Sequence, residues 1–152
     1  MSETNWRLRT AQETDFGTVA QMLAEADLPG EGMGGQFGKS FVVAEHEGNI
    51  VGAGGVEVYG HYGLLRSVVV DPAFRGKGLG EAIVSDRLRW SARQGLRAVY
   101  LLTTTVPEFF EKIGFTEMSR AEVPTEIQGS KEYSEICPVT ATAMVVRLDP
   151  LC

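Results

Sequence analysis

A glycine-rich, basic segment, Arg75-Gly76-Lys77-Gly78-Leu79-Gly80, has the residue types needed to bind an anion. It stands between an apolar, β-branched stretch (residues 64–70) and an amphipathic one (residues 79–93), which predicts a turn from a buried strand into a helix. Glycines let the backbone approach a ligand closely, and the first N–H groups of a helix lack partners within it. The positive end of the helix dipole lies at the same place, so the segment predicts a phosphate-binding site.

Two other phosphate-binding motifs are excluded by their spacing. Gly38-Lys39-Ser40 ends like a nucleoside-triphosphate loop, but Met33 stands where that motif needs its first glycine. A dinucleotide fingerprint that begins at Gly76 needs a third glycine where the chain has Glu81. Residues 75–97 carry a local charge of +4 in a chain of net charge −6, which favours a small ligand with several phosphates over a non-specific polyanion. A tight turn with solvated charges is the alternative.

Composition sets the class of protein. The chain has 152 residues, of which 43% are hydrophobic and 22% charged, so we expect one globular domain over residues 1–152. The acidic net charge argues against nucleic-acid and polybasic membrane partners. No apolar run approaches the ~20 residues that span a bilayer, and the first residues lack a signal-peptide pattern. We therefore expect a cytoplasmic protein without a nucleic-acid or membrane partner.

Cysteine and histidine patterns give no metal site. Cys137 and Cys152 are too few for a disulfide framework, and no histidine lies at metal-ligand spacing from either. We expect no bound metal.

Periodicity predicts alternating helices and strands. Helices are expected over residues 14–26, 79–93, 108–113 and 124–135, and strands over residues 41–46, 50–59, 64–70, 98–103, from 115 onward, and 141–148. A glycine-rich loop is expected over residues 30–40. This order predicts an α/β or α+β fold, with a mixed sheet that carries helices on its faces.

Two motifs together resemble the GNAT superfamily of N-acetyltransferases. These are Arg75-x-x-Gly78-x-Gly80 after Val68-x-Val70, and Phe109-Phe110-x-x-x-Gly114-Phe115. The resemblance spans nearly the whole chain and implies a twisted, mostly antiparallel central sheet with acetyl-CoA as co-substrate. It implies that amides of the glycine loop hold the pyrophosphate and that the strand backbone pairs with the pantetheine arm. The residues implied to bind acetyl-CoA are Val68, Val69, Val70, Arg75, Gly76, Lys77, Gly78, Leu79, Gly80, Phe109 and Phe110.

Three further segments resemble a narrower group. Leu64-Leu65-Arg66-Ser67-Val68, residues 101–105 and residues 130–138 are similar to GNAT proteins encoded beside arsenic-resistance genes and to short N-acetylglutamate-synthase-like proteins. This likeness does not specify the acceptor amine. It also leaves the oligomeric state open, a homodimer included.

Acetyl transfer to an amine needs a base that takes the ammonium proton. Glu57 is our first candidate, acting through water, and His61 is the second. In many family members a tyrosine on the helix after the fifth strand protonates the leaving thiolate, but Phe110 stands at that position. The proton donor could instead be a threonine in residues 103–105, a water or Tyr133. Alternatively, the thiolate leaves without a proton donor, because a thiol has a pKa of about 8.5. We favour the last alternative.

Arg66 lies in an otherwise apolar strand and is costly to bury unpaired. It either binds a carboxylate of the acceptor, which we favour, or pairs internally with Glu57. Strand alternation predicts that it shares a face with Val68 and Val70. Ser67 and Thr103 are further candidates for binding the acceptor.

The main hypothesis is therefore an N-acetyltransferase that acts in a ternary complex on a small, carboxylate-bearing amine. The alternative is a catalytically silent acyl-CoA-binding sensor.

Overall fold

The structure is a computed structural model that describes residues 5–28, 37–104, 106–130, 133 and 141–148. The chain folds as two compact units, which we call unit 1 (residues 1–55 and 67–87) and unit 2 (residues 56–66 and 88–152). Whether the chain behaves as one domain over residues 1–152 stays a prediction.

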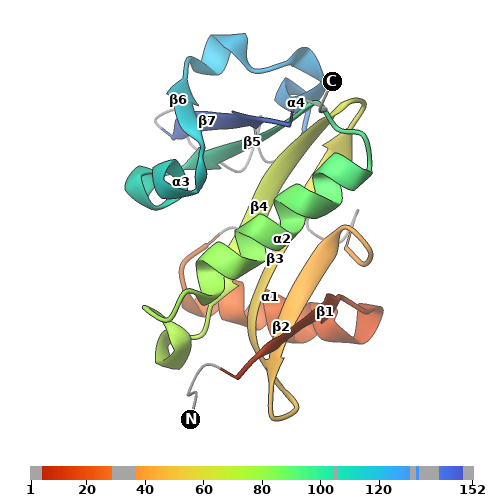
Figure 1. Cartoon of the computed structure of the whole chain (residues 1–152), viewed down its shortest axis with the longest axis vertical. Coiled ribbons are helices and arrows are strands. Elements are labelled where there is room, and N and C mark those ends of the chain that lie inside the picture. Colours follow the sequence, from red (N-terminus) through yellow and green to blue (C-terminus); the bar gives the residue numbers. More distant parts are fainter. Residues whose placement is uncertain (1–4, 29–36, 105, 131–132, 134–140, 149–152) are drawn as a thin grey trace. The chain divides into compact units, whose positions relative to one another are not determined.

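The described chain forms seven strands and four α-helices, drawn in Figure 1. Their order is β1 (Arg7–Thr10), α1 (Phe16–Glu25), β2 (Phe41–His46), β3 (Asn49–Tyr59), β4 (Tyr62–Val70), α2 (Leu79–Arg93), β5 (Ala98–Thr103), α3 (Pro107–Ile113), β6 (Thr116–Met118), α4 (Thr125–Gln128) and β7 (Thr142–Arg147). The strands are hydrogen-bonded in the order β1-β2-β3-β4-β5-β7-β6. The pairing of β4 with β5 is parallel, whereas β1–β2, β2–β3, β5–β7 and β6–β7 are antiparallel. The mixed, mostly antiparallel sheet is confirmed.

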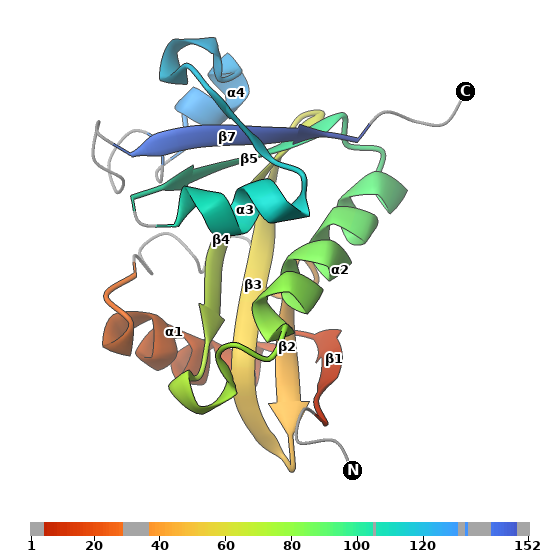
Figure 2. The ribbon, with the colours of Figure 1, turned by 60° about the vertical axis from the view of Figure 1, so that its left-hand side comes forward.

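In unit 1, α1 and α2 cover opposite faces of the strands (Figure 2). Phe41 and Val43 of β2 pack in one cluster with the buried side chains of α1. Val42 and Ala44, the alternate residues of the same strand, pack in another cluster with Leu79 and Ile83 of α2. This is the two-residue periodicity of a strand buried on both faces.

Glycines in β3 let α2 pack close to the sheet. A Cβ atom built on Gly54 lies 2.7 Å from Cγ2 of Ile83, and one built on Gly52 lies 2.9 Å from Cδ1 of the same residue. Real Cβ atoms do not approach so closely, so a larger residue at either position would force Ile83 to shift.

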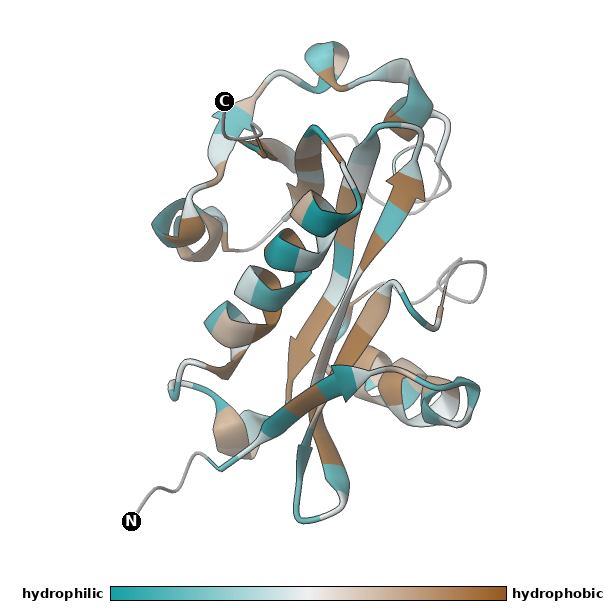
Figure 3. Ribbon diagram, turned by 45° about the vertical axis from the view of Figure 1, so that its right-hand side comes forward, coloured by the Kyte–Doolittle hydropathy of each residue, from teal (hydrophilic) through white to brown (hydrophobic). Residues whose placement is uncertain are grey.

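Unit 2 is built on the start of β4 with β5, β7 and β6. One core cluster joins Leu64, Tyr100 and Ala143 of these strands to Ile127 of α4. Burial raises the pKa of the Tyr100 phenol. In Figure 3 the strands carry much of the hydrophobic colour, and α2 carries both hydrophilic and hydrophobic residues along its length. The pattern matches a helix with one buried and one exposed side.

The expected elements between residues 41 and 118 are confirmed to within two residues at each end. Two corrections apply elsewhere. The strand β1 was not predicted, and Thr14 does not begin α1, because a short 3₁₀ turn, Glu13–Asp15, precedes the helix. Of the helix expected over residues 124–135, α4 forms Thr125–Gln128, and residues 131, 132, 134 and 135 lie outside the described residues. Residues 30–36 of the loop expected over residues 30–40 lie outside the described residues. No helix within the described ranges is long and apolar enough to cross a bilayer.

Candidate active site

The glycine-rich loop leads into the N-terminus of α2 in a conformation that only glycine adopts readily. Gly76 has φ +76° and Gly78 has φ +85°, both in the left-handed region. The amide of Ala82 donates to the carbonyl of Gly78 at 3.0 Å, so the amides of residues 79–81 precede the first helical hydrogen bond. Residues 75–78 are exposed. The loop thus offers backbone donors at the positive end of a 15-residue helix.

Side chains hold the strand end that leads into this loop. The carboxylate of Asp71 accepts a hydrogen bond from the amide of Ala73 at 2.8 Å. Nε of Arg75 donates to the carbonyl of Val70 at 3.3 Å. These contacts fix the end of β4 and the start of the loop relative to each other.

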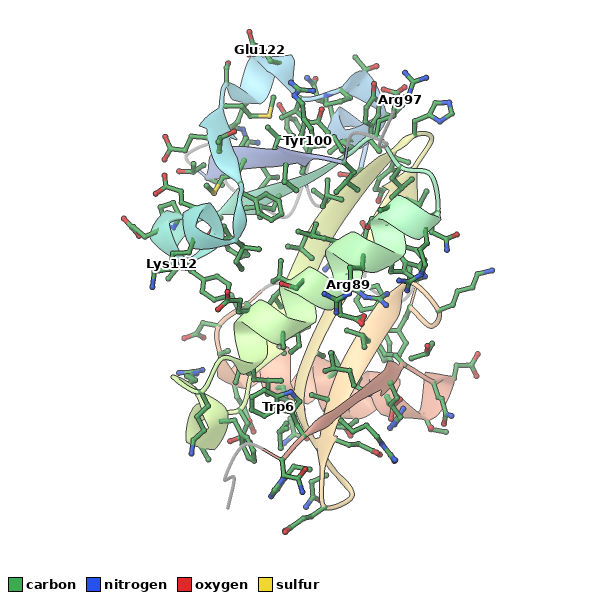
Figure 4. All side chains as sticks on the ribbon, in the orientation of Figure 1. Trp6, Arg89, Arg97, Tyr100, Lys112 and Glu122 are labelled. Carbon is green, nitrogen blue, oxygen red and sulfur yellow. The ribbon has the colours of Figure 1, made fainter. Side chains whose placement is uncertain are left out.

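The basic side chains of residues 75–97 are only partly on the surface. Arg89 and Arg97, labelled in Figure 4, are exposed, as are Arg75 and Lys77. Arg87, by contrast, is only 4% exposed. It lies three and four residues after Val84 and Ile83, which are fully buried, so it is on the buried side of α2.

Three polar side chains meet in unit 2 where β3 ends and β4 begins. The hydroxyl of Tyr59 donates to Oε1 of Glu57 at 2.6 Å. Nη1 of Arg66 donates to Oε2 of the same carboxylate at 3.1 Å. The side chains of Arg66 and Glu57 are 1% and 4% exposed, whereas Tyr59 is half-buried. We call this group the Glu57 cluster.

The Glu57 cluster contains Glu57 and Arg66, two of the residues that the sequence suggested for the acceptor side. Arg66 pairs internally with Glu57, which was one of its two predicted arrangements. Each carboxylate oxygen accepts one hydrogen bond and has a second lone pair that could accept another donor. Tyr59 was missed, although residues 57 and 59 of one strand share a face and could have been paired from the sequence.

The prediction that Arg66 shares a face with Val68 and Val70 stays a prediction, and the regular alternation on which it rests is interrupted between them. Ser67 has φ +60°, a left-handed conformation inside β4. Such a residue breaks the regular alternation of side chains, so strand periodicity cannot be carried across it. Beyond this point Val69 packs in the core cluster that contains α1 residues.

Thr103 and His61, two further candidates, are both in unit 2. Thr103 is buried, and its hydroxyl accepts a hydrogen bond from the amide of Val106 at 3.5 Å. His61 is exposed in the turn between β3 and β4. Roles for these residues and for Ser67 stay predictions.

The two phenylalanines of α3 are part of an aromatic stack. The rings of Phe109 and Phe110 lie 5.0 Å apart, and those of Phe110 and Phe115 lie 5.8 Å apart, both edge to face. Phe110 is buried and Phe109 is half-buried. This arrangement offers an apolar wall and no proton donor at the position of the family's tyrosine.

Tyr133, one alternative acid, has a structural contact. Its hydroxyl donates to the carbonyl of Arg120 at 2.9 Å, and the guanidinium carbon of Arg120 lies 4.6 Å from the centre of its ring. Using this hydroxyl as an acid would cost that hydrogen bond.

The described residues contain no group of three or more His, Cys, Asp or Glu side chains that could hold a metal ion. Cys137 and Cys152 lie outside the described residues.

Residues 37–117 match the acetyltransferase (GNAT) domain family. The match covers more than half of the chain, and the chain belongs to this family.

Individual relatives place the chain among acetyltransferases with different acceptors. It is 41% identical over 104 residues to an amino-acid acetyltransferase of Mycobacterium tuberculosis, which covers 65% of this chain and 56% of that protein. It is 40% identical over 60 residues to a glucosamine 6-phosphate N-acetyltransferase of Trypanosoma brucei brucei, which covers 38% of this chain and 40% of that protein. The chain thus matches about half the length of these curated relatives.

Solved structures share the fold. Rv2747 from Mycobacterium tuberculosis, in complex with CoA and NLQ, superposes with a TM-score of 0.79 at 26% identity over 93% of this chain and 98% of that chain. N-acetylglutamate synthase from Neisseria gonorrhoeae superposes with a TM-score of 0.81 at 22% identity over 97% of this chain and 34% of that chain. The second likeness shows the fold alone.

Proposed function

We propose that this chain transfers the acetyl group of acetyl-CoA to the amine of a small acceptor that carries a carboxylate, such as an amino acid. The observation that carries the proposal is the 41% identity with an amino-acid acetyltransferase over 104 residues. The structure of Rv2747 with CoA supports the choice of donor. The shorter match to a sugar-phosphate acetyltransferase makes the acceptor the part most in need of a test.

Acetyl-CoA supplies a thioester whose carbonyl carbon the acceptor amine attacks. On this chain its pyrophosphate would be held by the amides of residues 76–80, with Arg75 and Lys77 adding positive charge. The fit rests on the two left-handed glycines, which leave the backbone of the loop uncovered by side chains. Val68, Val69 and Val70 would supply strand backbone to the pantetheine arm, and Phe109 and Phe110 would line the thioester end.

Glu57 is the proposed base on the acceptor side. It takes the ammonium proton through a water, which leaves a neutral amine able to attack in a ternary complex. The thiolate then departs without a dedicated acid, in agreement with Phe110 at the usual acid position. Ser67 and Thr103 are proposed to contact the acceptor.

Arg66 is proposed to attract the carboxylate of the acceptor while it stays paired with Glu57. Nη1 of its guanidinium donates to Glu57, and a planar guanidinium suits a carboxylate geometrically. Because its side chain is 1% exposed, a direct contact would require a neighbour to move aside. A carboxylate-bearing acceptor would then gain a charged hydrogen bond that a simple amine lacks.

The narrower parts of the proposal rest on the sequence alone. They are the link to arsenic resistance, the cytoplasmic location, the absence of nucleic-acid and membrane partners, and a homodimer as one assembly.

The second candidate function is an acyl-CoA-binding sensor without turnover. It is favoured by the buried Phe110, which removes the acid that many family members use.

Release of free CoA from acetyl-CoA in the presence of a panel of amino acids separates the two. We expect turnover with at least one amino acid and none with its decarboxylated amine. Tight acetyl-CoA binding in calorimetry without turnover across the panel would instead favour the sensor. Equal turnover with the decarboxylated amines would contradict the acceptor class.

A further inference from the structure

Tyr59 is bound to the proposed base and belongs to none of the motifs that identify the family. Its hydroxyl lies 2.6 Å from Oε1 of Glu57, within the range of a hydrogen bond to an ionised carboxylate. Arg66 holds the other oxygen from a different strand. Both oxygens of the Glu57 carboxylate therefore accept a hydrogen bond.

Packing fixes the ring that carries this hydroxyl. Tyr59 is half-buried and packs against the core cluster of unit 2, which contains Leu64 and Ile127. Tyr59 is also two residues from Glu57 on the same face of β3. A donor on a fixed ring can set the orientation of the carboxylate, because neither the ring nor the strand is free to follow it.

We propose that Tyr59 is a positioning residue that holds Glu57 in the orientation needed to take the proton of the acceptor amine. This inference rests on the proposed function, with Glu57 as base. Without the hydroxyl, Oε1 loses this donor and the carboxylate can rotate about the bond that Arg66 still makes. Proton transfer then starts from a misaligned group, while the glycine loop that would hold acetyl-CoA is untouched.

The test compares Tyr59→Phe with Tyr62→Phe. Tyr62 is a matched control because it is also half-buried and packs against the same cluster, with its ring edge-on to Tyr100 at 5.9 Å. Both variants keep the ring and lose only a hydroxyl. Melting temperatures verify that both are folded, and CoA release gives kcat and KM for each substrate.

We expect Tyr59→Phe to lower kcat about tenfold to a hundredfold, the range for loss of a hydrogen bond to a charged group. The KM for acetyl-CoA should change less than about twofold, and Tyr62→Phe should retain wild-type kcat. Adding Tyr59→Phe to a Glu57→Gln variant should cause no further loss, because the positioned base is already gone.

Three results would overturn the inference. One is a wild-type kcat in Tyr59→Phe, another is an equal loss in Tyr62→Phe, and the third is the full additional loss in the Glu57→Gln background. In each of these the wild-type protein still turns over, so the proposed function stands. No turnover by the wild-type protein would overturn the proposed function, and the role of Tyr59 with it.

Discussion

Breaking the Arg66–Glu57 pair should destabilise the protein strongly. The two side chains are 1% and 4% exposed, so removal of Arg66 leaves a desolvated carboxylate without its cation. For a buried pair that loss costs about 3 to 5 kcal/mol. At about 2 to 4 °C per kcal/mol for a chain of this size, Arg66→Met should lower the melting temperature by roughly 6 to 20 °C.

The chain offers a matched control and a way to recover the loss. Arg7 pairs with the half-buried Glu45 at 3.7 Å, and because the arginine side chain is 81% exposed, Arg7→Met should cost less than about 1 kcal/mol. The double variant Arg66→Met/Glu57→Gln removes both charges and should recover at least half of the loss. Urea unfolding of the four proteins measures these differences. Equal costs for Arg66→Met and Arg7→Met would refute the argument from burial.

The same pair can be tested for acceptor recognition. Arg66→Lys keeps the charge and loses the planar fork, so it should weaken the use of carboxylate-bearing acceptors tenfold or more. Acetyl-CoA affinity should barely change. If Arg66→Lys weakens CoA binding instead, the assignment of Arg66 to the acceptor side is wrong.

Three further expectations concern other parts of the chain. Gly78→Val should abolish acetyl-CoA binding in calorimetry, because φ +85° strains any β-branched residue, whereas Gly17→Ala in α1, with open space around it, should leave binding unchanged. Phe110→Leu should keep most of the turnover in the CoA-release assay, since a loss beyond about a hundredfold is the scale of a missing general acid. Hydrogen bonds from Arg9 lower the pKa of Asp15 below its ordinary value, so Asp15 stabilises the fold above that value and the contribution is lost as the pH falls through the lowered pKa. In urea unfolding, Asp15→Asn should therefore be less stable than wild type at pH 7, and the gap should shrink below about pH 4; a gap that does not depend on pH would contradict this assignment.

Local patterns in the sequence determined most of the elements and the anion loop. In β2, β3, β5 and α2 the spacing of apolar residues can be recognised within a short stretch of sequence. This spacing arises because each element buries one or both of its faces. The loop at residues 75–80 was readable for a similar reason, because left-handed turns before a helix demand glycine. The strand β1 was missed because it has only four residues and forms by pairing with β2, which its own sequence does not encode.

Tertiary structure alone decided the arrangement around Glu57. The sequence left two partners possible for Arg66, a carboxylate of the acceptor or Glu57. Glu57 and Arg66 are nine positions apart and meet only if their strands pair in the right register. The left-handed Ser67 has no signal of its own, since a non-glycine residue takes that conformation only where its surroundings impose it. Periodicity is a local property of the chain, whereas the contacts of a buried charge depend on which distant segments surround it.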